Sequence, residues 1–295
     1  MLIGKRIGVW AAAALGLFSF AGTFPVTRGL INDFTPVQLG SGRVLLAAMM
    51  AGIILLWLRP GWPPRASWPY LLLASITVAL AFPLLLAIAL VDITASGAAV
   101  LGAVLPLVTG IAALLIAREQ PQRRFWWACS AGSCAVVIFA LQSGDWRWSF
   151  GNNWLAAGIV CASLGYAAGA RAAHLISAWQ VACWMVILAA PLNLLLLVIY
   201  WPEHSAVAEV GIWQWAGFVY LALFSQLLGF MGWNYALAQG GIARVGQLQL
   251  LQPFITLLLA WALLGEIISP LAIVTLLLVI GSIFWARSGA VKENL

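Results

Sequence analysis

Apolar runs of membrane length fill almost the whole chain, and short segments rich in proline, glycine and charge separate them. A helix needs about 20 apolar residues to cross a bilayer. Breaks such as Arg59-Pro60-Gly61 and Ser269-Pro270 mark the ends of runs. The pattern predicts ten transmembrane helices, at residues 7–27, 36–58, 68–91, 93–117, 125–141, 153–174, 178–201, 212–238, 243–265 and 270–287. We therefore expect an all-α integral membrane protein.

Composition supports this class and excludes others. The chain is 64% hydrophobic and only 7% charged, which leaves too little charge for the surface of a soluble protein. Its formal net charge is +6, but Lys and Arg lie between the apolar runs and form no single basic patch. No nucleic-acid partner is expected, and the cations indicate membrane orientation instead.

The orientation follows from the Lys and Arg residues in the short loops, because cytoplasmic loops carry an excess of them. If both termini are cytoplasmic, only Arg28 and Arg147 lie outside. The inner side then carries Lys5, Arg6, Arg59, Arg65, Arg118, Arg123, Arg124, Arg171, Arg244, Arg287 and Lys292. We expect a multi-pass protein of the inner (plasma) membrane with both termini in the cytoplasm.

The two halves of the chain repeat each other, with 147 positions between matching residues. The matching pairs are Trp68 and Trp215, Ala89-Leu90 and Ala236-Leu237, Pro106 and Pro253, Thr109 and Thr256, Ala113 and Ala260, and Glu119 and Glu266. We expect a first repeat at 7–141 and a second at 153–287. Each holds five spans, and this odd number requires the second copy to be inverted in the membrane. Inverted repeats are typical of secondary transporters, whose substrate site lies where the repeats meet.

The ordered landmarks resemble the EamA-type domains of the drug/metabolite transporter superfamily. In the first half they are Phe34-Thr35-Pro36, Arg43, Ala89-Leu90, Pro106 and Glu119, and in the second Ala236-Leu237, Gly240, Pro253, Gly265 and Glu266. Two features depart from the family pattern. Gly16-Leu17-Phe18-Ser19-Phe20 replaces a Trp-Gly-Ser-like cluster, and Arg43 has no counterpart in the second half. The resemblance implies a ten-helix exporter of amino acids or other small metabolites or drugs.

Polar and aromatic side chains inside the spans are the candidates for substrate contact, because lone polar groups are unfavourable in lipid. Ser19 and Thr23 share one helix face, and Gln226 and Asn234 share another. The candidate set is Ser19, Thr23, Arg43, Phe82, Tyr166, Gln226, Trp233, Asn234 and Gln252. For the amides, hydrogen bonding between helices remains an open alternative.

Arg43 lies about 10 Å inside its span, at about 1.5 Å per residue. Such a charge could attract a substrate carboxylate, cap helix carbonyls, or pair with Asp33 or Asp92. The resemblance favours a structural role, because the arginine belongs to the family pattern whatever the substrate.

Three prolines and two glutamates are candidates for mechanical and structural roles. Pro83, Pro106 and Pro253 interrupt their spans and could act as hinges or plain kinks. Glu119 and Glu266 stand at helix ends beside loops, which favours a structural role.

Other chemistry finds little support in the sequence. The four cysteines and two histidines show no metal-ligand spacing, no phosphate-binding loop is present, and no catalytic constellation lies at membrane depth. We expect no cofactor, no metal, no ATPase subunit and no enzymatic activity. No Asp or Glu lies in the central third of a span, which disfavours proton antiport and cationic drugs.

The leading hypothesis is alternating-access export of a small neutral or zwitterionic solute, above all a larger apolar or aromatic amino acid. Export down a gradient and exchange both stay open, and the protein is expected to work as a monomer or homodimer surrounded by lipid. A membrane scaffold or assembly protein is the alternative outside transport.

Overall fold

The structure, a computed structural model, describes residues 2–142, 149–201, 210–264 and 270–287. Within these ranges the chain forms helices joined by turns, and no strand is present. The prediction of an all-α fold is confirmed.

The helices of the two halves follow each other in similar order. The first half contains α1 (Leu2–Ala21), α2 (Thr23–Leu30), α3 (Arg43–Leu58), α4 (Trp68–Ala74), α5 (Phe82–Asp92), α6 (Ala95–Gly102), α7 (Leu105–Ala112) and α8 (Arg123–Gln142). The second half contains α9 (Phe150–Ala172), α10 (Ala178–Ile199), α11 (Ile212–Val219), α12 (Gly229–Gly240), α13 (Ile242–Gly246), α14 (Gln252–Leu264) and α15 (Pro270–Arg287).

Short segments of other helix types join these elements. The π-helical segments are η1 (Gln38–Gly42), η3 (Ser75–Ala81), η4 (Ala113–Ala117) and η6 (Tyr220–Leu228). The 3-10 segments are η2 (Arg65–Ser67) and η7 (Gln247–Leu251). Several helices are therefore continuous through the bundle but change their winding on the way.

Six helical stretches of the described chain are long and apolar enough to cross a membrane, judged by length and composition. They are Ile7–Leu30, Gln38–Leu58, Arg65–Asp92, Phe150–Ala172, Ala178–Ile199 and Ile212–Gly240. Leu105–Ala117 and Ile273–Trp285 are shorter apolar helices. Each of the ten predicted spans coincides with helix over most of its described length.

Local sequence explains where some helices begin. Ser177 and Gln180 form a capping box at the start of α10, in which each side chain pairs with the other residue's backbone. Gly241 separates α12 from α13 with φ +86° and ψ 133°, a conformation open in practice only to glycine.

The structural repeat keeps the register of the sequence repeat. The helices α5, α6 and α7 begin at residues 82, 95 and 105, and α12, α13 and α14 begin at residues 229, 242 and 252. Each pair of starts is 147 positions apart. The π-helical segments η3 and η6 also occupy matching places, so the duplication extends to the irregular turns.

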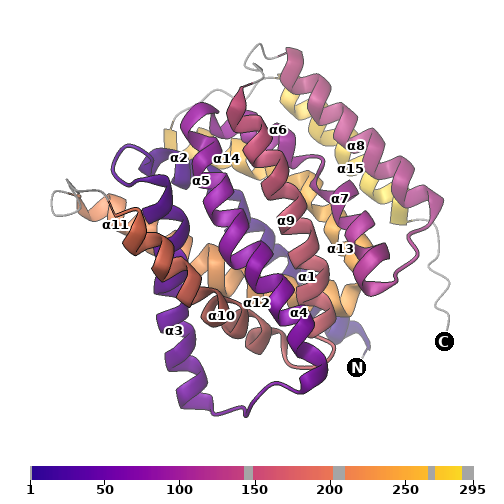
Figure 1. Cartoon of the computed structure of the whole chain (residues 1–295). Helices are drawn as coiled ribbons and strands as arrows, with labels where there is room; N and C mark the ends of the chain where they lie inside the picture. Colours follow the sequence, from indigo (N-terminus) through magenta and orange to yellow (C-terminus); the bar gives the residue numbers. More distant parts are fainter. Residues whose placement is uncertain (1, 143–148, 202–209, 265–269, 288–295) are drawn as a thin grey trace.

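The packing of the helices follows the same pseudo-symmetry. Helix α1 packs along α12, and its counterpart α9 packs along α4 and α5. Helix α3 packs against its own counterpart α10, as α8 does against α15 at one side of the bundle (Figure 1). Trp184, near the start of α10, packs on Trp62, just beyond the end of α3, with ring centroids 5.3 Å apart. The two counterpart helices therefore run in opposite directions, as an inverted repeat requires.

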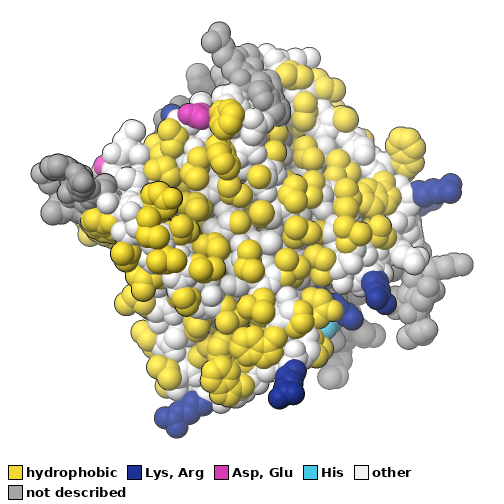
Figure 2. Space-filling model, viewed as in Figure 1, with side chains coloured by type: hydrophobic (Ala, Val, Ile, Leu, Met, Phe, Trp, Pro, Cys, Tyr) yellow, Lys and Arg dark blue, Asp and Glu magenta, His cyan; other side chains and the backbone are white. Residues whose placement is uncertain are grey.

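The surface is that of a protein embedded in lipid. Hydrophobic side chains cover most of the face seen in Figure 2, and most of the Lys and Arg side chains visible there lie along its lower and right rims. Trp57, Trp62 and Trp213 are 82%, 80% and 84% exposed near helix ends, as expected of aromatic anchors at the membrane boundary.

Candidate functional site

A small cavity lies at the centre of the molecule, where the two halves meet. Helices α1, α2, α3, α5, α6 and α7 line it from the first half, and α9, η6, α12 and α14 line it from the second. Its volume is about 20 Å³, room for about one water molecule. Ligand sites for small molecules usually measure about 300–1,000 Å³, so the helices are closed around this cavity.

The helices change their winding where they meet the cavity. Arg43 and Phe82 are the first residues after the π-helical segments η1 and η3, and Gln226 lies within η6. Gln252 is the first residue after the 3-10 segment η7. Irregular turns re-aim side chains and are frequent at functional sites in membrane carriers.

Six of the nine candidate residues line this cavity: Thr23, Arg43, Phe82, Tyr166, Gln226 and Gln252. Trp233 is fully buried in the aromatic layer beside it. Ser19 contributes its carbonyl to the neighbouring hydrogen bonds, and Asn234 lies against Gly169 on α9. The structure thus brings most of the set together but places Ser19 and Asn234 outside the cavity lining.

Four rings form an aromatic layer, defined as Phe20, Tyr166, Phe230 and Trp233. The Phe20 ring stands 4.8 Å from Phe230 and 5.8 Å from Trp233, measured between centroids. Tyr166 stands 5.8 Å from Phe230 and 6.0 Å from Trp233. The edge and tilted arrangements are those that aromatic pairs prefer. Phe20 belongs to α1 of the first half, and the other three rings belong to α9 and α12 of the second half. The layer therefore joins the two halves.

The join between α1 and α2 is held by side chains of the second half. Tyr220 Oη donates to the Ser19 carbonyl at 2.8 Å, and Thr256 Oγ1 donates to the Ala21 carbonyl at 2.8 Å. Gln252 Nε2 donates to the Phe20 carbonyl at a longer 3.5 Å. Thr23 Oγ1 and Ser225 Oγ lie 2.8 Å apart. The first three contacts satisfy carbonyls near the end of α1, before the break at Gly22, and the fourth joins two hydroxyl groups.

Several polar atoms in and around the cavity have no hydrogen-bond partner. They are Arg43 Nε, Gln226 Nε2, Trp233 Nε1 and Asn234 Nδ2. Arg43 is 2% exposed and Gln226 is 1% exposed. Unpaired buried polar groups are uncommon in proteins and mark positions where a ligand or water would bind.

The prolines stand at helix starts. Pro106 and Pro253 are the second residues of α7 and α14, and Pro83 is the second residue of α5. Pro106 follows a turn, but Pro83 continues directly from η3, where it cannot donate to the carbonyl four residues earlier. That carbonyl, of Ala79, accepts instead from Asn193 Nδ2 on α10 at 3.1 Å. The break before α7 frees the Ala103 carbonyl, which accepts a hydrogen bond from Ser133 Oγ on α8 at 2.6 Å.

Glu119, in the first half, accepts hydrogen bonds from α13 in the second half. Its Oε1 accepts from the Ile242 amide at 2.8 Å and its Oε2 accepts from the Ala243 amide at 3.0 Å. The carboxylate thereby caps the first turn of α13, where backbone amides point outward and favour negative charge. Glu266 lies outside the described residues.

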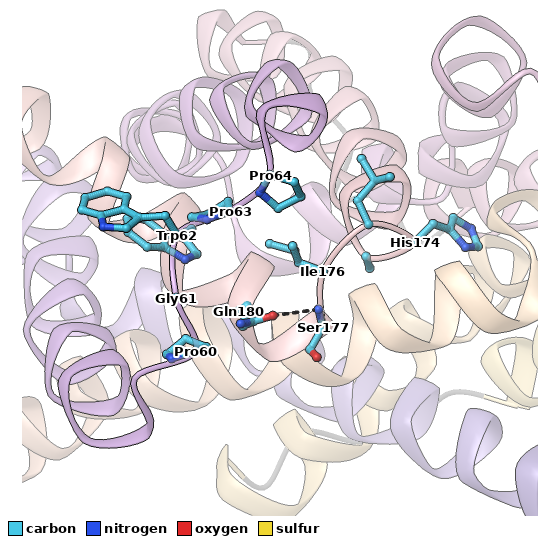
Figure 3. A pocket seen from close by; sticks show the side chains of 12 residues that line it. Pro60, Gly61, Trp62, Pro63, Pro64, His174, Ile176, Ser177 and Gln180 are labelled. Carbon is cyan, nitrogen blue, oxygen red and sulfur yellow. Dashed lines mark hydrogen bonds between the residues drawn. The ribbon is translucent and has the colours of Figure 1, made fainter.

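Two larger hollows open beside the loops that precede η2 and α10. Figure 3 shows the first, of about 520 Å³, where the loop from Pro60 to Pro64 faces the segment from His174 to Ser177. Gln180 in this hollow already accepts the Ser177 amide at 2.9 Å. The second, of about 500 Å³, is lined mostly by apolar residues of α1, α10 and α12, such as Ala12, Trp179 and Met231, together with Ser177 and Gln239.

Sequence reasoning missed part of the lining, namely Phe20, Phe24, Gly102, Leu105, Ser225 and Phe230. Phe20 and Phe24 are one turn apart beside Thr23, and Ser225 precedes Gln226. These neighbours of predicted residues were the available signal. Among the described residues, no group of three or more His, Cys, Asp or Glu could hold a metal ion.

Comparison with known proteins gives concordant results. The sequence profile of the EamA-like transporter family matches residues 6–141 and again 149–288. The "Uncharacterized transporter YdeK" of Bacillus subtilis is 39% identical over 264 residues, which are 90% of this chain and 91% of that protein. The "Probable terminal-alkyne amino-acid exporter" of Streptantibioticus cattleyicolor is 28% identical over 272 residues, 90% and 88% of the two chains.

A solved crystal structure superposes on 97% of this chain and 96% of its own, with a TM-score of 0.75 and 17% sequence identity. At that identity the likeness shows the fold alone. The profile matches each half separately, as the sequence repeat predicts. This multi-pass membrane protein belongs to the EamA-like transporter family.

Proposed function

We propose that this transporter is a secondary carrier that exports small neutral or zwitterionic metabolites by alternating access. Amino acids with larger apolar or aromatic side chains are the leading substrates. We place it in the inner (plasma) membrane with both termini in the cytoplasm, and we take residues 7–141 and 153–287 as the two repeat units.

The central cavity carries this proposal. It lies between the repeats, and its lining combines amide and hydroxyl groups with four phenyl rings, those of Phe20, Phe24, Phe82 and Phe230. Rings suit an apolar side chain, and the amides and hydroxyls suit the polar end of an amino acid. The relative from Streptantibioticus cattleyicolor is named as an amino-acid exporter, which favours the same class here.

The closed state of the cavity fits a carrier that opens to one face at a time. Along α12, Phe230 lines the cavity, whereas Met231 and Tyr235 line the apolar hollow beside the α9–α10 loop. Trp233, between Met231 and Tyr235 in sequence, packs close to Gly16 on α1. We assign the aromatic layer as the closure between cavity and hollow, with the breaks at Pro83, Pro106 and Pro253 as bending points.

Export of other small metabolites or drugs is the second candidate, because the same cavity could serve apolar solutes of similar size. A scaffold role is the alternative outside transport. We expect transport without a cofactor, an ATPase subunit or an enzymatic step.

Reconstitution into liposomes tests these readings. Vesicles containing the purified chain and loaded with phenylalanine, leucine, a sugar and a cationic drug are diluted, and release of each solute is followed against protein-free vesicles. Faster release of the amino acids supports the proposal. Release of only the other solutes would move the assignment to the second candidate, and no release across a broad panel would favour the scaffold.

A further inference from the structure

Arg43 brings a positive charge into the central cavity. It is the first residue of α3, it is 2% exposed, and its side chain lines the cavity between the repeats. A charged side chain inside a membrane protein needs a partner, because neither lipid nor a small dry cavity solvates it.

No acidic partner faces this charge within the described part of the chain. None of the described residues that line the cavity is Asp or Glu. Arg43 Nε is buried without any acceptor, and the Tyr166 side chain lines the same cavity. The carbonyls at the end of α5 are capped by a different arginine, Arg28. Its Nη1 donates to the Leu90 and Val91 carbonyls.

A second unpaired donor lines the same cavity. Gln226 lies in η6 on the opposite repeat, is 1% exposed, and has no acceptor for its Nε2 group. Two donors without acceptors, one of them cationic, call for an acceptor group on the ligand. A carboxylate meets this need best, since guanidinium and carboxylate form charge-assisted hydrogen bonds with matching geometry.

We propose that Arg43 is the carboxylate receptor of the central cavity, with Gln226 as second donor, and that the cargo class is apolar and aromatic monocarboxylates. A substrate ammonium group is not required, because no carboxylate of the described lining is there to receive one. A monoanion neutralises Arg43, whereas an amine would add a second positive charge. This inference rests on the proposed transport function and changes its substrate class from neutral or zwitterionic solutes to apolar and aromatic monocarboxylates, amino acids included.

Competition among three solutes with the same phenyl group tests the proposal. Liposomes containing the full chain take up radiolabelled phenylalanine in the presence of excess 3-phenylpropanoate, phenylalaninamide or phenethylamine. We expect 3-phenylpropanoate to inhibit at least as well as unlabelled phenylalanine, and both amines to be weaker by roughly tenfold or more, the effect of about 1.4 kcal/mol. Equal inhibition by an amine, or none by 3-phenylpropanoate, overturns the proposal.

Ligand-induced thermal stabilisation of the purified wild-type protein gives a readout that does not depend on flux. The same four solutes are compared at equal concentration, since a ligand that binds only the folded state raises the unfolding temperature. Stabilisation by the two carboxylates alone supports the inference even if phenylalanine is not transported. Stabilisation by none of them, or equally by the amines, contradicts it.

Variants assign the effect to Arg43. In Arg43→Gln the preference for carboxylate over amide should fall by roughly tenfold or more, and Arg43→Lys should retain part of it through its charge. Arg28→Gln, which removes a cation outside the cavity, is the matched control and should keep the preference. A folded Arg43→Gln protein with unchanged preference refutes the assignment, and if that variant does not fold, Arg43→Lys and the wild-type stabilisation series decide.

Discussion

At the residue scale, a polar side chain in the cavity can hold helices together or contact a substrate, and Gln252 illustrates both roles. Its amide donates to the Phe20 carbonyl across the repeat interface, but at 3.5 Å the bond is long, and the side chain also lines the cavity. Thr256, one turn further along α14, makes a shorter bond to the neighbouring carbonyl at 2.8 Å. Thr256 is therefore the stronger structural contact, which leaves the Gln252 amide available to a substrate.

Replacing Gln252 with alanine should slow transport by roughly two- to tenfold, the effect of one lost hydrogen bond of about 0.5–1.5 kcal/mol. Protein level and thermal stability should change little, because the bond to Phe20 is long. Ser282→Ala on α15 is the control, since Ser282 Oγ donates to Val279 within the same helix. Parallel loss of transport and stability in Gln252→Ala would show instead that Gln252 mainly holds the helices together.

At the element scale, contacts between helices of opposite repeats fix the arrangement. Glu119, after the π-helical end of α7, caps α13. Gly165 on α9 lies very close to η3, the π-helical segment that precedes α5. A Cβ added at Gly165 would meet Thr77 Oγ1 at 2.6 Å. A charged cap and a close helix crossing are both sensitive to a single substitution.

Glu119→Ala should lower the free energy of unfolding by about 0.5–2 kcal/mol, the usual value of an N-cap. Glu119→Gln should lose less, because an amide oxygen can still accept one backbone amide. Thermal unfolding in detergent measures the difference, and Asp92→Ala, at the exposed end of α5, serves as the control. If Glu119→Ala unfolds at the wild-type temperature, the cap contributes nothing to stability.

Gly165→Ala should destabilise the packing of α9 on η3, because the new methyl group meets Val78 and Thr77. We expect less folded protein in membranes and a lower unfolding temperature. Gly52→Ala on α3 is the matched control, since an added Cβ there meets nothing within 4 Å, and alanine is favoured over glycine in helices by about 1 kcal/mol. Similar behaviour of the two variants would contradict the close crossing.

At the scale of the whole molecule, the inverted repeat determines which loops share a side of the membrane. The loop with Trp62 and the loop before α10 lie together around one hollow (Figure 3), and both are expected on the cytoplasmic side. The end of α5 at Asp92 is expected on the opposite side.

Cysteine labelling checks this topology. In a background without Cys129, Cys134, Cys161 and Cys183, a membrane-impermeant maleimide should label Asp92→Cys in intact cells. Trp62→Cys, at a position 80% exposed, should react only after the membrane is permeabilised. The reverse pattern would place both termini outside.

The sequence alone determined the helical class, the number and positions of the apolar runs, the duplication and the family, because hydrophobicity and spacing are properties of the chain itself. The repeat register of 147 residues reappears in the starts of α5 and α12. Polarity inside spans also selected five residues of the cavity lining, since a polar group is unfavourable in lipid, and Phe82 was selected as an aromatic residue.

Only the tertiary structure decided which candidates meet. Ser19 and Asn234 looked equivalent to Thr23 and Gln226 in sequence because each pair shares a helix face, but they lie one and two turns away along the helix and outside the cavity lining. Apolar lining residues such as Phe230 carry no sequence signal, because a phenylalanine facing lipid looks the same. The unpaired state of Arg43 is likewise a property of the assembled bundle, since partners in a membrane protein come from helices far apart in the chain.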